Sequence, residues 1–477
     1  MAIIKKIAYN TVFATGARLV GVALSLINIG LITRYLGKEG FGSYSLIFAF
    51  LYIFNILADL GLYSLMTREI SKPGVDEKKI ASNIFTIRVF ALLVFLGLAV
   101  VTIWFFPYTS EVKSGILIAS IGFLFLSASQ VLMGIFQKYL RIDKAGVADL
   151  IARIVQLGLV AIMIYLKMGL FAILMAVNAS CIINFIFNWI FARKHVAVGF
   201  DFDFSLWKKI IRDALPIAAS IVLTLIYFKF DTVFLSLKFI NRYSVSPLND
   251  VGIYNVAYKV LEGLIFFPAM FVGLIMPMLS NFAESNLEEF KKTFQKVFDV
   301  LIIFIVPIIA GLLMLALPIV VLIGGGQFEA SAPALQILSF AIGFIFLGNL
   351  LGSSIIALNK QKIGAWIYFG GMIFNIITNL IFIPKYTYLG AASTTLATEL
   401  LVTLLMFYLV YKTIHYFPSF RAVFKALIAG IVMGAFIWFF REWNLFLLVG
   451  LGVVVYFGIL YLIRGIKKEE IALLIKK

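Results

Sequence analysis

The sequence predicts an all-α polytopic membrane protein with about 14 transmembrane helices. Of its 477 residues, 63% are hydrophobic and only 13% are charged, and the mean hydropathy is +1.06. A soluble fold of this composition has too few polar side chains to cover its surface. Apolar runs of about 20 residues, the length that crosses a hydrocarbon core of about 30 Å, recur along the chain and leave room only for short loops.

The first apolar run begins after Lys5 and Lys6 and is longer than the core of a signal peptide, so we expect it to be the first span. Pro268 and Pro277 in the eighth span, and Pro307 and Pro318 in the ninth, predict helix bends. In chain order, the expected spans are 7–33, 41–66, 83–106, 115–138, 148–166, 170–193, 214–237, 254–281, 297–323, 333–357, 364–383, 390–413, 424–440 and 445–463.

The basic residues predict the orientation. About 27 of the 40 Lys and Arg residues fall in the termini and even-numbered loops, against about 8 in the opposite loops, so both termini are expected in the cytoplasm of a cell-membrane protein. This bias accounts for most of the net charge of +17, and no nucleic-acid partner is expected. The long cytoplasmic connection 194–212, with Asp201, Asp203 and Trp207, is expected to lie along the membrane interface and to join two halves.

Short motifs recur in order along the chain. Phe-Gly-Ser-Tyr at 41–44 recurs as Val-Gly-Ile-Tyr at 251–254, an offset of about 210 residues. Two further pairs, at offsets of about 218 and 221, are Asp-Lys-Ala-Gly at 143–146 with Gln-Lys-Ile-Gly at 361–364, and Met-Gly at 168–169 with Leu-Gly at 389–390. The matched spans share their orientation, which predicts two parallel six-helix repeats around a central cavity.

Three segments follow from this repeat. Residues 1–200 form an N-lobe with spans 1–6, residues 201–415 form a C-lobe with spans 7–12, and residues 416–477 add spans 13 and 14 and a cytoplasmic tail. Such a duplicated architecture is typical of transporters that work by alternating access. Duplicated channels and enzymes also exist.

Charged residues inside spans are costly in hydrocarbon, so they should face a cavity or a partner. Arg18 lies about eleven residues into its span and is the strongest candidate for gripping an anion such as a phosphate. Arg88 and Arg153 lie nearer the cytoplasmic side, where contact with headgroups is an equal alternative to binding substrate. Asp59 is similarly shallow, and it either neutralises an arginine or takes part in ion coupling.

The second lobe carries fewer cations. Lys229 is a further cation for the cavity, and Asp231 lies two positions away, so the two cannot pair within one helix. Lys259 and Glu262 are three apart and are expected to form a structural ion pair. Glu399 is deep and isolated, which suits either a proton or Na⁺ site or a neutral acid between helices.

Amide side chains recur within the spans, and they could line a cavity that accepts sugars. For most of them, hydrogen bonding between helices is the favoured role. They are Asn55, Gln130, Gln156, Asn178, Asn184, Asn188, Asn375 and Asn379. Cys181 is the only cysteine, so no disulfide or cysteine-based metal site is expected. A phosphate-binding Gly-Lys-Ser/Thr loop is also missing, and we expect no cofactor beyond a coupling H⁺ or Na⁺.

The residues resemble a known family. The stretch Arg-Tyr-Leu-Gly-Lys-Glu-Gly-Phe-Gly-Ser-Tyr at 34–44, followed by Asp-Leu-Gly-Leu at 59–62 and Arg-Glu at 68–69, is similar to the N-terminal signature of polysaccharide-biosynthesis membrane proteins. Lys-Phe-Asp-Thr-Val-Phe-Leu at 229–235 resembles the family's seventh-span pattern. These are O-antigen-type oligosaccharide flippases of the multidrug/oligosaccharidyl-lipid/polysaccharide exporter superfamily.

The resemblance implies a flippase, not an enzyme, that moves a polyprenyl-pyrophosphate-linked oligosaccharide from the cytoplasmic to the outer leaflet for surface polysaccharide biosynthesis. It implies coupling to an ion gradient, for which Asp231 or Glu399 could bind H⁺ or Na⁺. The expected partners are membrane lipids and glycan-assembly proteins, and we expect a monomer. The alternatives are a multidrug or cation antiporter on the same fold, which would have an acidic cavity, a membrane glycosyltransferase or polymerase, and a structural scaffold. A catalytic domain would need a larger outer loop than any that the hydropathy leaves.

Overall fold

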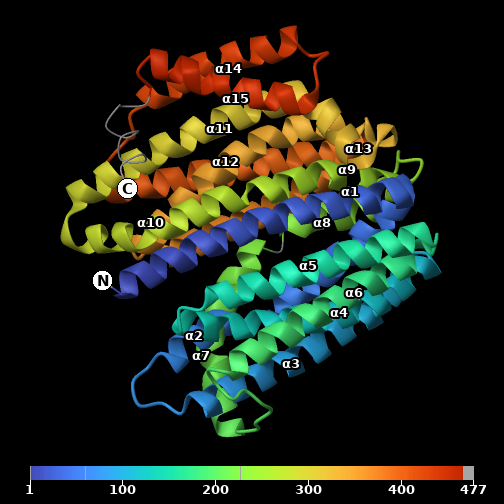
Figure 1. Cartoon of the computed structure of the whole chain (residues 1–477), viewed down its shortest axis with the longest axis vertical. Coiled ribbons are helices and arrows are strands. Elements are labelled where there is room, and N and C mark those ends of the chain that lie inside the picture. Colours follow the sequence, from blue (N-terminus) through green and yellow to red (C-terminus); the bar gives the residue numbers. More distant parts are fainter. Residues whose placement is uncertain (1, 60, 226, 466–477) are drawn as a thin grey trace. The chain divides into compact units, whose positions relative to one another are not determined.

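The computed structural model confirms an all-helical architecture (Figure 1). It describes residues 2–59, 61–225 and 227–465, and among these the side chains of 2–15, 18, 19, 215–225, 227 and 228 fall outside the description. Within the described residues, eleven segments are long and apolar enough to cross a membrane, so the chain is a multi-pass membrane protein. Two of these segments, Val20–Ile70 and Gln361–Ile414, each join two stretches predicted as separate spans, and no segment among the eleven covers the predicted span 214–237, so the count of fourteen is not reproduced directly.

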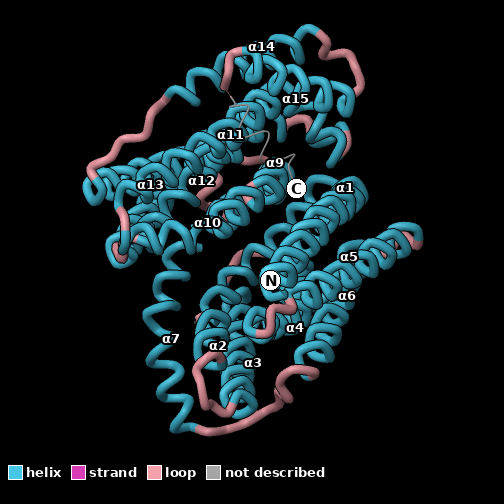
Figure 2. Tube along the Cα trace, turned by 60° about the vertical axis from the view of Figure 1, so that its left-hand side comes forward, coloured by secondary structure: helices cyan, strands magenta, loops and turns pink. Residues whose placement is uncertain are grey.

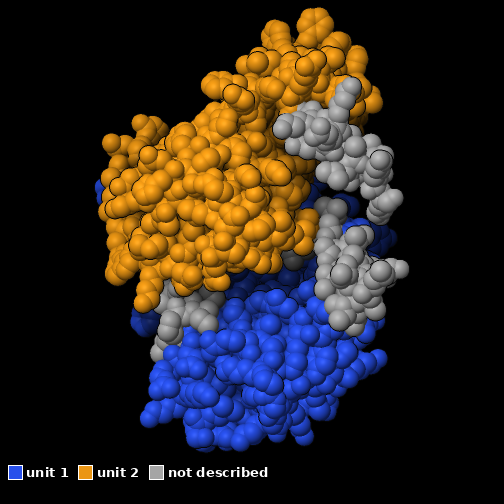
Figure 3. All heavy atoms as spheres, turned by 90° about the vertical axis from the view of Figure 1, so that its left-hand side faces the viewer, with its two compact units in different colours: residues 1–252 blue, residues 253–477 orange. Residues whose placement is uncertain are grey.

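The chain divides into two compact units, residues 1–252 and 253–477, coloured separately in Figure 3. In unit 1, α3, α4, α6 and α5 pack side by side in that order (Figures 1 and 2), and α8 packs against α1. The helices of unit 1 are α1 (Ala2–Asp59), α2 (Leu62–Ile70), α3 (Glu77–Thr102), α4 (Ser110–Lys138), α5 (Ile142–Tyr165), α6 (Gly169–Arg193), α7 (Phe204–Leu225) and α8 (Tyr227–Ser236).

Helix α9 (Pro247–Leu264) begins in unit 1 and ends in unit 2. In unit 2, α12 packs between α11 and α13, and α14 and α15 pack against α11. The helices of unit 2 are α10 (Phe266–Ser285), α11 (Leu287–Gly324), α12 (Ser331–Ala357), α13 (Gln361–Ile414), α14 (Arg421–Phe439) and α15 (Leu445–Leu462). The boundary between the two units falls after Gly252, so α7 and α8 belong to unit 1. The three predicted segments, 1–200, 201–415 and 416–477, place these helices in the second lobe, and they stay predictions.

Backbone breaks explain the difference in span boundaries. Gly37 in α1 and Thr387 in α13 have positive φ angles of 68° and 52°, so each continuous segment is two helices joined at a kink. Gly61, with φ 67°, separates α1 from α2 inside the expected span 41–66. The expected span 254–281 is likewise divided, because α9 ends at Leu264 and α10 starts at Phe266.

Two turns in different units have the same geometry. Leu140 after α4 and Asn359 after α12 have φ angles of 52° and 57°. Each is followed by a residue whose N–H donates to a carbonyl five positions earlier, Arg141 to Phe136 at 2.8 Å and Lys360 to Ile355 at 2.9 Å. This is a left-handed helix C-cap. The two turns lie about 219 residues apart, in line with the repeat found in the sequence.

The glycines of the repeated Phe-Gly-Ser-Tyr and Val-Gly-Ile-Tyr motifs, Gly42 and Gly252, meet within unit 1. A methyl group on Gly42 would lie 1.8 Å from the Leu248 carbonyl oxygen, and one on Gly252 would lie 2.2 Å from the Lys38 carbonyl oxygen. The contact is reciprocal, because each glycine touches the residue four positions before the other. Only glycine allows two backbones to approach so closely, so the two repeated glycines define a helix crossing.

Replacement of Thr387 by glycine is expected to raise thermal stability slightly. Thr387 is β-branched and has φ 52° and ψ −127°, a conformation that glycine adopts without a steric penalty and threonine does not. The expected gain is about 1 kcal/mol, measured as an increased melting temperature in detergent. The matched control is Thr413→Gly, at a helical position of α13, which should lower it. A lower melting temperature for Thr387→Gly would contradict the strain argument.

Candidate functional site

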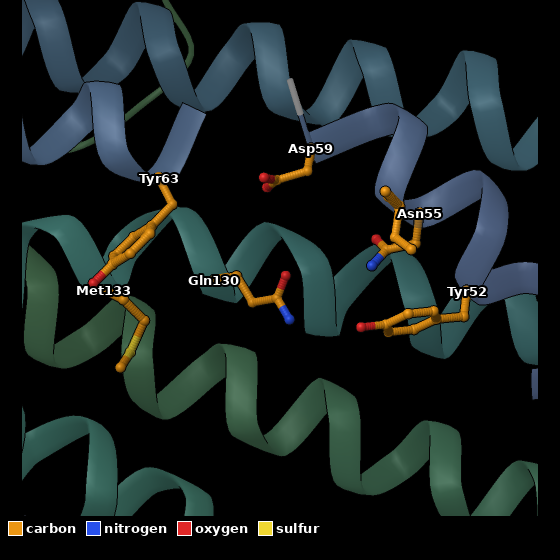
Figure 4. Close-up of a pocket in the computed structure, with 7 residues that line it drawn as sticks. Tyr52, Asn55, Asp59, Tyr63, Gln130 and Met133 are labelled. Carbon is orange, nitrogen blue, oxygen red and sulfur yellow. The ribbon is translucent and has the colours of Figure 1, made fainter. Parts of the chain in front are cut away.

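Unit 1 contains a cavity of about 310 Å³ between α1, α2 and α4, with several polar side chains in its lining. Figure 4 shows Asp59 on one wall and Gln130 across from it, with Tyr63 and Met133 toward one end and Tyr52 and Asn55 toward the other. Its lining comprises Tyr52, Asn55, Ile56, Asp59, Tyr63, Gln130 and Met133. A carboxylate, two amides and two phenols inside membrane-spanning helices form a concentrated set of hydrogen-bonding groups.

One face of α1 supplies most of this lining. Tyr52, Asn55 and Asp59 follow each other at spacings of three and four residues, so their side chains lie on the same side of the helix. After the break at Gly61, α2 continues the lining with Tyr63, whose hydroxyl donates to Gln137 Oε1 on α4 at 2.8 Å. The left-handed glycine therefore lets two helices share one wall of the cavity.

Arg88 on α3 is fully buried and forms an ion pair with Asp59, with Nη1 2.8 Å from Oδ1. The helix begins at Glu77, eleven residues before Arg88, rather than at residue 83. The guanidinium is enclosed by protein, and the two predicted roles of Arg88, contact with headgroups and binding of substrate, both stay predictions. In this structure Asp59, and not Arg88, contributes to the cavity lining.

The Arg88 guanidinium also bonds to α4. Its Nη2 donates to Ser127 Oγ at 2.5 Å and to Gln130 Oε1 at 3.5 Å, and its Nε donates to the Ser127 carbonyl at 3.4 Å. Ser127 Oγ in turn donates to Asn55 Oδ1. A buried charge is tolerated when it is paired and hydrogen-bonded, and this network links three lining residues, Asn55, Asp59 and Gln130, through Arg88.

Lys229 on α8 contacts the cavity wall from another side. Its ammonium lies 5.5 Å from the centre of the Tyr52 ring, within the range of a cation–π contact, and its side chain is half-buried. The structure thus places predicted residues Asp59, Arg88 and Lys229 around one cavity. Asp231, two positions further along α8, is 2% exposed.

The other two arginines are placed differently. The Arg18 side chain lies outside the described residues, and its predicted role stays a prediction. Arg153 on α5 pairs with Asp149 at 2.7 Å, one helical turn away, and donates to Ser25 Oγ on α1. Neither partner of Arg153 lines the cavity of unit 1.

The predicted residues of unit 2 form two further groups. Lys259 Nζ lies 2.6 Å from Glu262 Oε2, as their spacing predicts; a purely structural role for this pair stays a prediction. Glu399 on α13 is 5% exposed, and the adjacent Thr398 accepts a hydrogen bond from Asn375 at 3.3 Å. Its role as an ion-coupling group also stays a prediction.

Four of the eight predicted amides hydrogen-bond to a neighbouring helix rather than line the cavity, and Gln156 of α5 does so by accepting from Ser180 of α6 at 3.5 Å. Asn178 donates to the Ile118 carbonyl of α4 at 2.7 Å, and Asn184 and Asn188 both bond to Ser129 of α4 at 2.8–2.9 Å. Asn379 donates to Asn375 within α13 at 3.0 Å. Asn55 and Gln130 are the amides among the cavity-lining residues.

Sequence reasoning missed Tyr52, Tyr63, Ser127 and Met133. Candidate residues were selected because they are charged or carry an amide. The phenols of Tyr52 and Tyr63, the hydroxyl of Ser127 and the thioether of Met133 do not meet these criteria. The signal was present for Tyr52, which lies on the same helical stripe as Asn55 and Asp59. Ser127 and Met133 could not be found, because only the packing of α4 against α1–α3 brings them to the site.

A model of the family described as "Polysaccharide biosynthesis protein" matches residues 7–283 of this chain. "Capsular polysaccharide biosynthesis protein CapF" of Staphylococcus aureus is 26% identical over 368 residues, which cover 76% of this chain and 90% of that protein. The family match therefore includes every lining residue of the cavity.

Solved structures share the fold at low sequence identity. The lipid II flippase MurJ in an inward closed conformation superposes with a TM-score of 0.78 at 16% identity, covering 94% of this chain and 98% of that one. An inward-facing multidrug resistance MATE family transporter of the MOP superfamily gives a TM-score of 0.68 at 15% identity, covering 85% and 98%. At these identities the likeness shows the fold.

Proposed function

Since this chain belongs to the polysaccharide biosynthesis protein family, we propose that it moves a polyprenyl-pyrophosphate-linked oligosaccharide from the cytoplasmic to the outer leaflet by alternating access. The cavity in unit 1 is the observation that carries this proposal. Its amides, phenols and carboxylate can accept and donate hydrogen bonds to sugar hydroxyl groups in a region otherwise made of apolar helices. Relatives named for polysaccharide biosynthesis and a fold shared with a lipid II flippase support it.

The cations have a separate role in this proposal. Lys229, half-buried beside Tyr52, lies where it can attract the pyrophosphate or an acidic sugar. Arg18 and Arg153 are further candidates for holding the pyrophosphate along its path. Arg88 acts as a positioning residue, because it holds the carboxylate of Asp59 and the amide of Gln130 in fixed orientations around the cavity.

Ion coupling is assigned to three carboxylates, half-buried Asp59 and buried Asp231 and Glu399. Asp59 is the best placed, because it touches both the cavity and Arg88. A proton or Na⁺ arriving at Asp59 would compete with Arg88, so occupancy of the cavity and of the ion site would be linked. Asp231 and Glu399 are the other candidates for this coupling.

A second candidate function is export of cationic drugs. The specific observation in its favour is that the described lining of the cavity contains the Asp59 carboxylate and two phenols. The two nearby cationic residues, Arg88 and Lys229, are not part of that lining. Such a lining can accept an organic cation over the faces of Tyr52 and Tyr63. The fold shared with a multidrug MATE transporter is compatible with it.

Transport in proteoliposomes separates the two candidates. We expect the purified protein to move a fluorescent polyprenyl-pyrophosphate oligosaccharide across the bilayer, with a rate that depends on an imposed H⁺ or Na⁺ gradient. Lys229→Gln is expected to reduce this rate about tenfold or more, since it removes the cation beside the cavity. Lys78→Gln, at an exposed position of α3, is the matched control. Uptake of a cationic dye without movement of the oligosaccharide would overturn the proposal in favour of drug export.

A further inference from the structure

Asn83 on α3 binds the loop between α6 and α7. The side chain is fully buried, and its Oδ1 accepts hydrogen bonds from the backbone N–H of Asp203 at 2.9 Å and from Trp207 Nε1 at 2.8 Å. Its Nδ2 donates to Asp201 Oδ2 at 2.9 Å. Figure 2 shows this loop running past the N-terminal end of α3 before it enters α7. One amide thus uses both its acceptor and its donor on one loop.

Neighbouring residues on α3 add to this contact. Ser82 Oγ accepts from Gly199 N at 3.1 Å and Thr86 Oγ1 accepts from Asp201 N at 3.0 Å. Asp203 forms an ion pair with Lys79 at 2.8 Å and also caps α7 by accepting from the Leu206 N–H at 3.1 Å. The hydrogen bond from Lys79 holds the pKa of Asp203 well below its usual range, so the carboxylate stays charged at neutral pH.

Gln295 on α11, which is half-buried, binds the loop between α13 and α14 through its amide oxygen and nitrogen. Its Oε1 accepts from the backbone N–H of Ser419 at 2.7 Å and from the Tyr416 hydroxyl at 2.8 Å. Its Nε2 donates to Asp299 Oδ1 at 2.7 Å and to the Ser419 carbonyl at 3.1 Å. Ser419 precedes the first turn of α14, as Asp203 precedes the first turn of α7.

The two contacts share their chemistry. In both, an amide oxygen accepts one backbone N–H just before a helix and one donor from an aromatic side chain. The amide nitrogen donates to the loop in both cases, to the Asp201 carboxylate in the first contact and to the Ser419 carbonyl in the second, and the Asp299 partner of Gln295 lies on its own helix. Asn83 and Gln295 are about 212 residues apart, and Asp203 and Ser419 about 216, in line with the offsets of the repeated motifs. Each contact lies within its own unit.

We propose that Asn83 and Gln295 are equivalent positioning residues, one in each repeat, that hold α7 to α3 and α14 to α11. We call these contacts the linker clasps. Directional hydrogen bonds fix the register of a loop where apolar packing in lipid would let it slide. The consequence for transport rests on the proposed function: α7 leads into α8, so the clasp of Asn83 sets how Lys229 lies beside Tyr52.

Distance measurements between spin labels test the clasps without any substrate. In a Cys181→Ala background, labels at exposed Lys78 and Lys208 report on α3 and α7, and labels at Lys296 and Arg421 report on α11 and α14. We expect narrow distance distributions that broaden in Asn83→Leu and Gln295→Met respectively, each variant affecting its own unit alone. Asn349→Leu is the control, because its amide donates at 2.8 Å to a carbonyl of its own helix. An unchanged distribution in Asn83→Leu would overturn the proposal.

An exchange of the Asn83 and Asp201 side chains tests their pairing by restoring the hydrogen bond between them, rather than only by removing it. Asn83→Asp places a carboxylate against Asp201 and should broaden the α3–α7 distribution. The double variant Asn83→Asp with Asp201→Asn reverses the donor and acceptor, so the distribution should narrow again, at least in part. Failure of the double variant to narrow it, in protein of normal abundance, would contradict the pairing of these two residues.

The transport assay then separates a positioning role from binding. Asn83→Leu is expected to lower kcat for the fluorescent lipid-linked oligosaccharide about fivefold or more and to leave KM within about twofold, since the residue does not line the cavity. A raised KM with unchanged kcat would overturn the positioning role. If the native protein moves no oligosaccharide at all, the proposed function fails, whereas the clasps are still judged by the label distances.

Discussion

Replacement of Asp59 by asparagine is expected to reduce both stability and transport strongly. The change leaves the fully buried guanidinium of Arg88 without its anionic partner, which now lies 2.8 Å away. Removal of one member of a buried pair destabilises by about 3–5 kcal/mol, because the remaining charge stays desolvated. The measurement is the melting temperature and the abundance of the variant in detergent, followed by transport in proteoliposomes.

A double variant shows whether the pair itself is responsible. Arg88→Met together with Asp59→Asn removes both charges, so it should recover much of the stability that each single change removes. Transport should not recover, because the cavity then lacks its carboxylate. Asp149→Asn, which breaks the more exposed Arg153 pair, is the control and should change stability by less than about 1 kcal/mol. Additive losses in the double variant would show that the two residues do not act as a pair.

Alanine at Gly42 or at Gly252 is expected to destabilise unit 1. Each added methyl group would lie 1.8 or 2.2 Å from a carbonyl oxygen of the other helix, so the two backbones must separate. Forced separation of this kind should lower stability by about 1–3 kcal/mol for either single variant, measured by thermal unfolding in detergent. Once the helices have separated, the second methyl group adds little, so the double variant should lose less than the sum.

Gly97→Ala is the matched control for this crossing. Gly97 lies inside α3, is exposed, and has no atom within 4 Å of an added methyl group. Alanine has the higher helix propensity, so this variant should be as stable as the native protein or slightly more stable. If Gly42→Ala behaved like Gly97→Ala, the close reciprocal contact would not exist in the protein.

The sequence by itself determined the helical membrane architecture and the family. Long apolar runs leave no other way to satisfy the backbone in lipid, so helices could be predicted from composition and periodicity. The offset between motifs also predicted structural equivalences, which the turns at Leu140 and Asn359 illustrate. Span boundaries were less accurate, since a single positive φ angle, as at Thr387, joins or divides helices without any change in hydropathy.

The site was only partly predictable. Asp59 and Arg88 were selected from their charge, and the possibility that Asp59 neutralises an arginine agrees with their ion pair. The sequence could not show that Arg88 lies outside the cavity lining while its guanidinium bonds to Asp59 and Gln130, because the partner of a charge depends on the neighbouring helices. The linker clasps could not be predicted from the sequence for the same reason, since Asn83 and Asp203 are 120 residues apart in the chain.

Hydropathy and charge therefore determined which residues need a partner, because burying a polar group in lipid is costly wherever it occurs. The tertiary structure decided which group is the partner of each of these residues. Asn178, Asn184 and Asn188 bond across to α4 and join helices, whereas Asn55 and Gln130 line a cavity, although all five are amides in apolar helices. The physical reason is that hydrogen bonds act over about 3 Å, and only the packing of the helices sets which groups come that close.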